Sequence, residues 1–254
     1  MTFKSVALKA LLGFTIFTSS FAASSATLRI GTEPTFAPFE FMNNASGTYE
    51  GFDMDMIREA VKRMGHTPEL HQMGFDSLVP SLRTNSIDII AAAMTITPKR
   101  QRAVAFTQPY YDAGQGIMVL EANRDRYVDL KTLEGARIAV QIGTTGAEMA
   151  VKIPGAKVYK YNTTNEAILE LRNRGVDAVL LDKPVLGYFT VVNPRAAKGM
   201  VVQPGVFGAE SFGFAVNKQN TQLLKGLNEA LDAMRKDGTY DRIYAKWFGT
   251  TERR

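Results

Sequence analysis

The sequence contains no cysteine and only two histidines among its 254 residues. Without cysteine the chain can form no disulfide, and it has no thiol for a lipid anchor, a metal or a catalytic nucleophile. His66 and His71 are five positions apart around a proline, and we place both in one connecting loop. We therefore expect no transition-metal site, no Cys–His pair and no Ser–His–Asp triad.

Long apolar runs are also absent. The apolar stretch at residues 10–17 is well short of the ~20 residues that cross a bilayer as a helix, and no later stretch is longer. It follows two lysines and precedes small residues that end at Ala26, which is the pattern of a secretory signal peptide. We predict cleavage after Ala26, removal of residues 1–26 and export to the periplasm. An uncleaved membrane anchor is the alternative.

No long run of lysine and arginine is present, and the aromatic residues are scattered through apolar patterns. The formal charge of +5 falls by two, to +3, when Lys4 and Lys9 leave with the signal peptide. Nucleic acid is therefore not an expected partner. An apolar fraction of 45% is that of an ordinary globular protein with buried cores.

A short internal repeat indicates how the chain is organised. Leu82–Ile90, LRTNSIDII, recurs 89 positions later as Leu171–Val179, LRNRGVDAV. Each copy is predicted to be a helix end, a turn and a buried strand, so the chain predicts two similar α/β lobes. Ligands of such lobes bind at the carboxyl ends of the strands. A shift of 89 places Asp182 opposite Ala93, which predicts two strand ends facing each other across a cleft.

The pattern around the two copies repeats as well, although the nine-residue match alone could arise by chance. A strand, a helix and a second strand fill residues 28–92 in the order expected of a parallel sheet. A capping box and a terminal glycine bound a helix in the second unit. The predicted elements are strand Leu28–Gly31, helix Asp53–Met64, strand Ala136–Val140 and a helix from Thr163 with Glu166 to Gly175.

A long amphipathic helix follows Phe214–Val216 and ends at Gly238. We assign it, with the aromatic segment Tyr240–Phe248, to the first lobe. The chain then crosses between the lobes twice, near Tyr111–Gly114 and near Gly208–Phe212, which predicts a two-strand hinge. The predicted domains are 27–112 with 209–254 for lobe I and 113–208 for lobe II.

The segment Thr95–Arg100, TITPKR, combines a helix N-cap, a proline at the first helical position and a cation one turn in. A helix start favours an anion, and a guanidinium can hold a carboxylate with two bonds. Arg100 is therefore a candidate clamp for an α-carboxylate. Asp182, at the end of an apolar strand, is a candidate acceptor for an ammonium. Spacing alone equally allows a solvated Arg100 and a purely structural helix cap at Asp182.

Seven segments carry a resemblance to a known family: TEPTFAPFEF, YEGFDMDM, GFDSLVPSL, DIIAAAMTITPKRQRAVAFTQPYY, GTTG, GVDAVLLD and DGTYDRIYAKWFG. They resemble the polar amino-acid-binding proteins of ABC importers, bacterial solute-binding protein family 3, which includes glutamine, arginine, histidine and lysine-arginine-ornithine binders. The resemblance implies a type II periplasmic binding protein fold: two α/β lobes, each a mostly parallel sheet flanked by helices, joined by two strands. It also implies a cofactor-free monomer that closes on an L-amino acid and delivers it to an ABC transporter membrane permease.

By position, the resemblance assigns the backbone-like groups of the ligand. It makes Arg100 the carboxylate clamp, helped by the Thr95 hydroxyl and the backbone N–H of Thr145. It makes Asp182 the ammonium acceptor, together with the Ala93 carbonyl.

The ligand side chain is assigned in the same way. Phe36 and Phe75 would sandwich its aliphatic stem, and both rings could hold a guanidinium by cation–π contact. Family members commonly have Asp at the position of Glu33, and the glutamine binder has Lys at that of Gln141. These residues favour arginine or a related basic amino acid, with glutamine next. A Glu33 that is merely hydrated at the cleft rim is the alternative.

Two other functions use the same scaffold. Some members of the superfamily dehydrate prephenate or arogenate, which requires a carboxylic acid in the cleft. The family enzyme has Glu in the turn after the third strand, where this chain has Gly146 and Ala147. Glu148 is one step further and should point elsewhere. We therefore expect a binding protein rather than an enzyme, while a sensor domain for a receptor kinase stays open.

Overall fold

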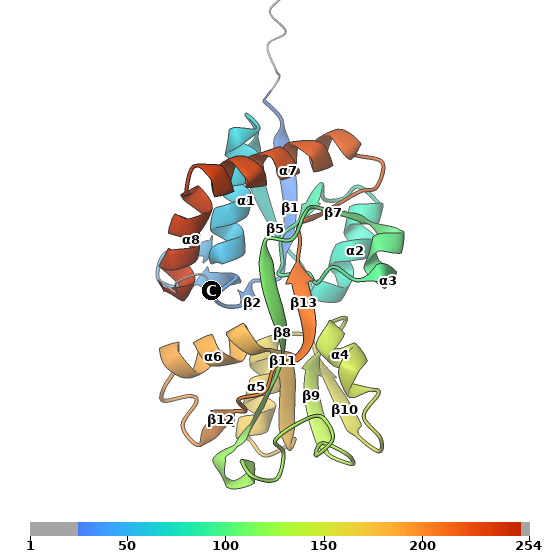
Figure 1. Ribbon diagram of the computed structural model, residues 1–254, viewed down its shortest axis with the longest axis vertical. Helices are drawn as coiled ribbons and strands as arrows, with labels where there is room; N and C mark the ends of the chain where they lie inside the picture. The colour runs from blue at the N-terminus through green and yellow to red at the C-terminus, as the bar shows by residue number, and fades with distance from the viewer. Residues whose placement is uncertain (1–24, 250–254) are drawn as a thin grey trace, which may run out of the picture.

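The computed structural model describes residues 25–249 and shows two sheet-based lobes stacked along the long axis of the molecule (Figure 1). Apart from its last two residues, the predicted signal peptide, 1–26, lies outside the described residues. Within the described range, every helix is too short or too polar to cross a membrane.

The first lobe is built on a five-stranded sheet of order β5-β1-β6-β14-β7. β5, β1 and β6 are parallel, whereas β14 runs antiparallel to both of its neighbours because it returns from the other lobe. A small antiparallel sheet, β2-β3-β4, lies beside it. The strands are β1 Thr27–Thr32, β2 Thr35–Phe36, β3 Glu40–Asn43, β4 Thr48–Glu50, β5 Thr67–Gln72, β6 Ile89–Ile90, β7 Ala105–Phe106 and β14 Ala215–Val216.

Five helices belong to this lobe, and all of them except the short α3 bury apolar side chains. α1 and α7 both carry buried residues at helical spacing, and their apolar faces join one core cluster with α8. Figure 1 shows α7 and α8 packed beside α1. The helices are α1 Phe52–Arg63, α2 Phe75–Arg83, α3 Pro98–Ala103, α7 Thr221–Lys236 and α8 Thr239–Phe248.

The second lobe has a six-stranded sheet in which β10, β9 and β11 are parallel. β8 runs antiparallel to β11, and β12 and β13 both pair antiparallel with β8. Buried clusters cover both of its faces. The predicted capping box of Thr163 and Glu166 is confirmed at the start of α5. The elements are β8 Tyr111–Leu120, η1 Glu121–Asn123, β9 Arg137–Gln141, α4 Thr145–Ala150, β10 Lys157–Tyr161, α5 Thr164–Arg172, β11 Ala178–Asp182, α6 Lys183–Val192, β12 Met200–Val202 and β13 Phe207–Phe212.

The internal repeat has the same structure in both lobes. Asp88, in the first copy, accepts from the backbone N–H of Arg29 at 2.8 Å and pairs with its guanidinium at 2.9 Å. Asp177, at the matching position of the second copy, accepts from the N–H of Arg137 at 2.8 Å and pairs with its guanidinium at 2.9 Å. Each aspartate therefore ties the turn before the repeat strand to the first parallel strand of its own lobe.

The turn of each copy also has the same backbone conformation. Asn85 has φ 58° and Arg174 has φ 65°, and these two residues occupy equivalent positions of the repeat. Left-handed φ values are uncommon for residues other than glycine, so a shared one is a specific structural match. The repeat thus marks two equivalent helix–turn–strand units.

Strand β5 corrects one prediction. His71 lies within β5 and His66 directly precedes it, so the two histidines are not in a single connecting loop. Among the described strands, β5 pairs with β1 alone, and its residues are mostly half-exposed or exposed. Such an edge strand tolerates Pro68 and lacks the apolar run by which a central strand is recognised.

Two paired strands connect the lobes. β8 and β13 run antiparallel, with Tyr111 opposite Phe212 and Ala113 opposite Glu210 (Figure 1). A Cβ added at Gly114 would lie 2.5 Å from the Gly208 carbonyl oxygen, so the two strands can approach this closely only without a side chain there. The lobes are thus joined by a narrow ribbon, which is suited to bending.

Candidate functional site

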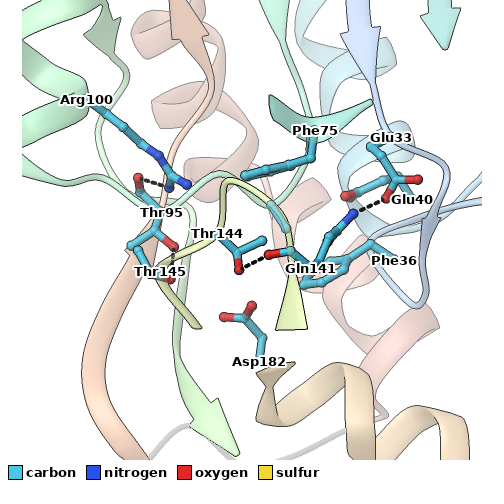
Figure 2. Close-up of a pocket in the computed structure, with 12 residues that line it drawn as sticks. Glu33, Phe36, Glu40, Phe75, Thr95, Arg100, Gln141, Thr144, Thr145 and Asp182 are labelled. Atoms are coloured by element: carbon cyan, nitrogen blue, oxygen red, sulfur yellow. Dashed lines mark hydrogen bonds between the residues drawn. The ribbon is translucent and has the colours of Figure 1, made fainter. Parts of the chain in front are cut away.

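A cavity lies between the lobes, at the carboxyl ends of strands from both sheets (Figure 2). The space between the lining side chains is narrow: the centre of a water-sized sphere can move through only about 10 Å³, so an amino acid can enter only when the lobes open or the side chains shift. The structure brings together all nine residues predicted from the sequence. The lining residues are Glu33, Phe36, Glu40, Phe75, Ala92, Ala93, Thr95, Arg100, Gln141, Thr144, Thr145 and Asp182.

Hydrogen bonds across the cleft hold the lobes together around this cavity. Gln141 of the second lobe donates to the Glu33 carboxylate of the first at 2.9 Å. Arg100 of the first lobe donates to the Gly143 carbonyl of the second at 3.0 Å. The cleft is therefore closed. Further contacts join Thr164 to Thr35 and Lys99 to Glu148.

The local sequence fixes Arg100 in the first turn of α3. Thr97 caps this helix by accepting from the Arg100 N–H, and Pro98 is its first residue. The guanidinium donates to the carbonyls of Thr95 at 2.8 Å and Gly143 at 3.0 Å, and it lies 5.3 Å from the Phe75 ring centroid. Burial lowers the pKa of Arg100, although nearby carboxylates oppose the shift. Arg100 is thus not a solvated surface charge, and within residues 25–249 it has no carboxylate ion pair.

Asp182 ends β11 and stands at the N-cap position of α6, but its side chain makes no capping bond. Its carboxyl instead accepts from the Gln115 side chain at 3.1 Å. Burial raises the pKa of Asp182 to about 8, and the carboxylate of Glu210 adds to the shift. A cation beside Asp182 would lower this pKa again, so the group is suited to an ammonium rather than to helix capping.

Ala93, three residues beyond the end of β6, has a left-handed backbone with φ 43°, which is strained for alanine. Its N–H donates at 2.8 Å to the fully buried Asp53. The Tyr110 hydroxyl donates to the same Asp53 oxygen, and burial raises the pKa of Asp53 to about 7. The buried Asp53 carboxyl therefore anchors the backbone of Ala93, which lines the cavity.

Two glutamates occupy the end of the cavity opposite Arg100 (Figure 2). Glu33 is 5% exposed and accepts from Thr35 and Gln141, so it is not a hydrated residue at the rim. Glu40 is fully buried, and neither of its oxygens has a hydrogen-bond partner within the described chain. Burial raises the pKa of Glu33. Burial also raises the pKa of Glu40 well above its usual range, and the negative charge of Asp53 raises the pKa of Glu40 further.

The backbone around Glu40 is fixed by the start of α1. Gly51, the residue before this helix, has φ 132°, and a Cβ there would lie 2.0 Å from the Phe39 carbonyl oxygen. Only glycine permits that approach. The first N–H groups of α1, from Phe52 and Asp53, then donate to the carbonyls of Pro38 and Phe39. The turn that carries Glu40 is therefore held by the helix start.

Two threonines face each other across the cleft, one from each lobe. Thr95 precedes α3, and Thr145 is the first residue of α4, where a backbone N–H has no acceptor within the helix. Both hydroxyls donate to one oxygen of Glu210, each at 3.0 Å. Gln115 bridges the same oxygen, at 3.2 Å, to Asp182. Gln115 of β8 and Glu210 of β13 thus contact the residues that line the cavity.

The family is established by comparison with known proteins. Residues 28–250 match the family model described as bacterial extracellular solute-binding proteins, family 3. The chain belongs to this family. The resemblance predicted from its sequence motifs is confirmed, and so is the two-lobe α/β fold.

Similar proteins match most of the chain. A putative ABC transporter arginine-binding protein of Escherichia coli is 35% identical, over 94% of this chain and 98% of its own length. An ancestral arginine-binding protein, solved with arginine and with glutamine, is 42% identical with a TM-score of 0.84, over 88% of this chain and 98% of its own. An ancestral amino acid-binding protein described as a precursor of cyclohexadienyl dehydratase is 37% identical with a TM-score of 0.81, over 87% and 95%.

Sequence reasoning missed several residues of the candidate site. Glu40 lies within the motif TEPTFAPFEF, and a single acid in an otherwise apolar APFEF stretch is the signal that could have identified it. Gln115 and Glu210 lie in the hinge strands and have no local signal, because only strand pairing brings them to the cleft. Glu148 does point elsewhere: it pairs with Lys99 at 2.6 Å and does not line the cavity.

Proposed function

We propose that this family 3 protein binds L-arginine, or a closely related basic amino acid, and delivers it to the membrane permease of an ABC importer. The observation that carries the proposal is the pair of buried acids, Glu33 and Glu40, opposite Arg100 in one closed cavity. An amino acid with a cationic side chain has a carboxylate to pair with Arg100 at one end and a cation to pair with Glu33 and Glu40 at the other.

The charge of the cavity favours a cationic side chain. Arg100 is the one basic residue among those that line it, against three acids, Glu33, Glu40 and Asp182. Buried charges need partners, and a zwitterion alone would supply only one cation, its ammonium. A basic side chain supplies the second cation.

The free acceptors of Glu33 and Glu40 favour arginine among the candidate ligands, because its side chain has the most donors. The two oxygens of Glu40 have no donors within residues 25–249, and Glu33 has room for more. A guanidinium brings five N–H donors in a plane, whereas the glutamine amide brings two and no charge. Phe36 and Phe75 line the space between the two ends and offer faces to the aliphatic stem and to the cation. The relatives described as arginine-binding support this choice.

At the other end, we assign the α-carboxylate to Arg100, with the Thr145 N–H and the Thr95 hydroxyl, and the α-ammonium to Asp182 and the Ala93 carbonyl. These groups belong to both lobes, so neither lobe alone satisfies the ligand. Capture then requires closure about β8 and β13. We propose that residues 27–112 with 209–254 move as one body and 113–208 as the other, in a monomer exported to the periplasm and cleaved after Ala26.

We propose binding without catalysis. Gly146 and Ala147 stand where the family enzyme has its acid, and Glu148 is paired outside the cavity. Glu40 and Asp182 are cavity residues whose raised pKa would suit a general acid, and a structural neighbour is described as a dehydratase precursor. Dehydration of prephenate and arogenate therefore belongs in the test.

The test is calorimetry of the mature protein with arginine, lysine, histidine, glutamine and glutamate, together with an assay for dehydration. We expect arginine to bind most tightly, glutamate not to bind and no dehydration to occur. Glu40→Gln should reduce the preference for arginine over glutamine. Glu50→Gln, on the neighbouring strand β4 and outside the cavity, is the matched control and should keep that preference. Tight glutamate binding, or turnover of either cyclic acid, would overturn the proposal.

A further inference from the structure

Glu210 places a carboxylate behind the site that we assign to the ligand's own carboxylate. It lies on hinge strand β13, opposite Ala113 of β8, and it is not among the residues that line the cavity. One of its oxygens accepts three hydrogen bonds, from Thr95 and Thr145 at 3.0 Å each and from Gln115 at 3.2 Å. Thr95 belongs to the first lobe and Thr145 to the second, so this oxygen ties the two lobes together.

The Thr95 hydroxyl cannot donate to Glu210 and to a ligand carboxylate at the same time. A threonine hydroxyl has one proton and can donate one hydrogen bond. While the Thr95 hydroxyl donates to Glu210, it has no proton for a ligand carboxylate. The same holds for the hydroxyl of Thr145. Glu210 and a bound α-carboxylate therefore compete for the same donor at Thr95.

We propose that Glu210 is an internal competitor that substitutes for the ligand α-carboxylate in holding the lobes closed, and so sets the affinity. The inference rests on the proposed binding of an L-amino acid. When ligand enters, the Thr95 proton turns from Glu210 to the ligand carboxylate, and the contact between Glu210 and Thr95 is lost. In the unliganded protein, the contacts of Glu210 with Thr95 and Thr145 thus favour the closed form over the open form that admits ligand.

The charge of Glu210 also disfavours a ligand carboxylate at Arg100. The negative charge of Glu210 adds to the raised pKa of Asp182 and acts on Arg100. A second carboxylate brought beside Arg100 would be repelled by Glu210, because like charges in a partly buried site are screened less than in water. Removing Glu210 should therefore favour an anionic group at Arg100.

The test compares Glu210→Ala and Glu210→Gln with the control Asp112→Asn. Asp112 is also a hinge carboxylate and accepts from Ser211 at 2.8 Å, but it does not contact either threonine. Calorimetry would use L-arginine and L-argininamide, which differ only in the ligand carboxylate. Small-angle scattering of each unliganded variant would report closure independently of binding.

We expect Glu210→Ala to bind L-arginine about tenfold more tightly, equivalent to about 1.4 kcal/mol, with a distinctly smaller gain for L-argininamide. Glu210→Gln should show a smaller gain, because an amide oxygen accepts more weakly than a carboxylate. The unliganded Glu210→Ala protein should have a larger radius of gyration than wild type. Asp112→Asn should not show the gain in affinity.

Several results would overturn the inference: unchanged or weaker L-arginine binding by a folded Glu210→Ala, an equal gain for the two ligands, or the same gain in Asp112→Asn. If Glu210→Ala does not fold, the near-isosteric Glu210→Gln decides by the same comparison. If wild type binds no basic amino acid, the proposed function fails. The scattering of the unliganded variants then tests the role of Glu210 in closure by itself. An unchanged radius of gyration in Glu210→Ala would contradict that role.

Discussion

Replacing Glu40 with methionine should have opposite effects on stability and on binding. Glu40 is fully buried and neither oxygen has a partner among residues 25–249. Leaving a buried polar group without a hydrogen bond costs about 1 to 3 kcal/mol in proteins. Methionine has a similar length and no such oxygens, so Glu40→Met should raise the free energy of unfolding of the unliganded protein by roughly 1 to 3 kcal/mol at neutral pH.

Binding should change in the opposite direction. A charge-assisted hydrogen bond contributes about 1.5 to 3 kcal/mol, and the guanidinium of arginine would lose at least one such bond to Glu40. A loss of about 2 kcal/mol weakens arginine binding by roughly thirtyfold. Glutamine, which brings no positive charge to this end, should lose less.

Two measurements check this prediction. Urea denaturation of wild type, Glu40→Met and Glu40→Gln gives the change in the free energy of unfolding. Calorimetry with arginine and glutamine gives the change in selectivity, and Glu50→Met, outside the cavity, is the control. A destabilised Glu40→Met protein would refute the idea that Glu40 is held at an energetic cost. Unchanged arginine affinity would refute its role in recognising the ligand.

Three further predictions follow from the same site. Arg100→Ala should weaken every amino acid by about 2 to 5 kcal/mol, because an α-carboxylate in a closed cleft loses its charged partner; calorimetry within threefold of wild type would contradict the clamp. Glu33→Gln should cost arginine roughly 1 to 2 kcal/mol and glutamine less, so equal losses in competition binding would contradict its role in selectivity. Folding raises the pKa of Asp53 to about 7 and that of Asp182 to about 8, so the unliganded protein binds more protons than the unfolded chain between about pH 4 and 8. Its free energy of unfolding should therefore fall as the pH rises through that window, and denaturation at pH 5 and pH 8 measures the sign.

Local features of this protein were determined by the sequence itself. The proline and threonine at the start of α3 and the capping box of α5 stabilise helix ends through neighbours only three residues away. The repeat is equally local, since Asn85 and Arg174 adopt left-handed turns within their own short segments. The two α/β lobes, the family and the cavity residues that lie in family motifs could therefore be predicted from the sequence. Short-range hydrogen bonds and apolar spacing depend on adjacent residues, so they can be recognised without the fold.

The tertiary structure decided how polar groups are buried and paired. Gln141 and Glu33 are 108 positions apart, and Thr95 and Glu210 are 115 apart, so no local pattern predicts their bonds. Glu40 is fully buried, and the start of α1, from a later segment, bonds to the two residues that precede it. The edge strand β5 likewise forms by pairing with β1 and carries little signal of its own. Burial and hydrogen-bond partners arise when distant segments pack together, which is why the lobes could be predicted from the sequence whereas the Glu40 and Glu210 contacts required the fold.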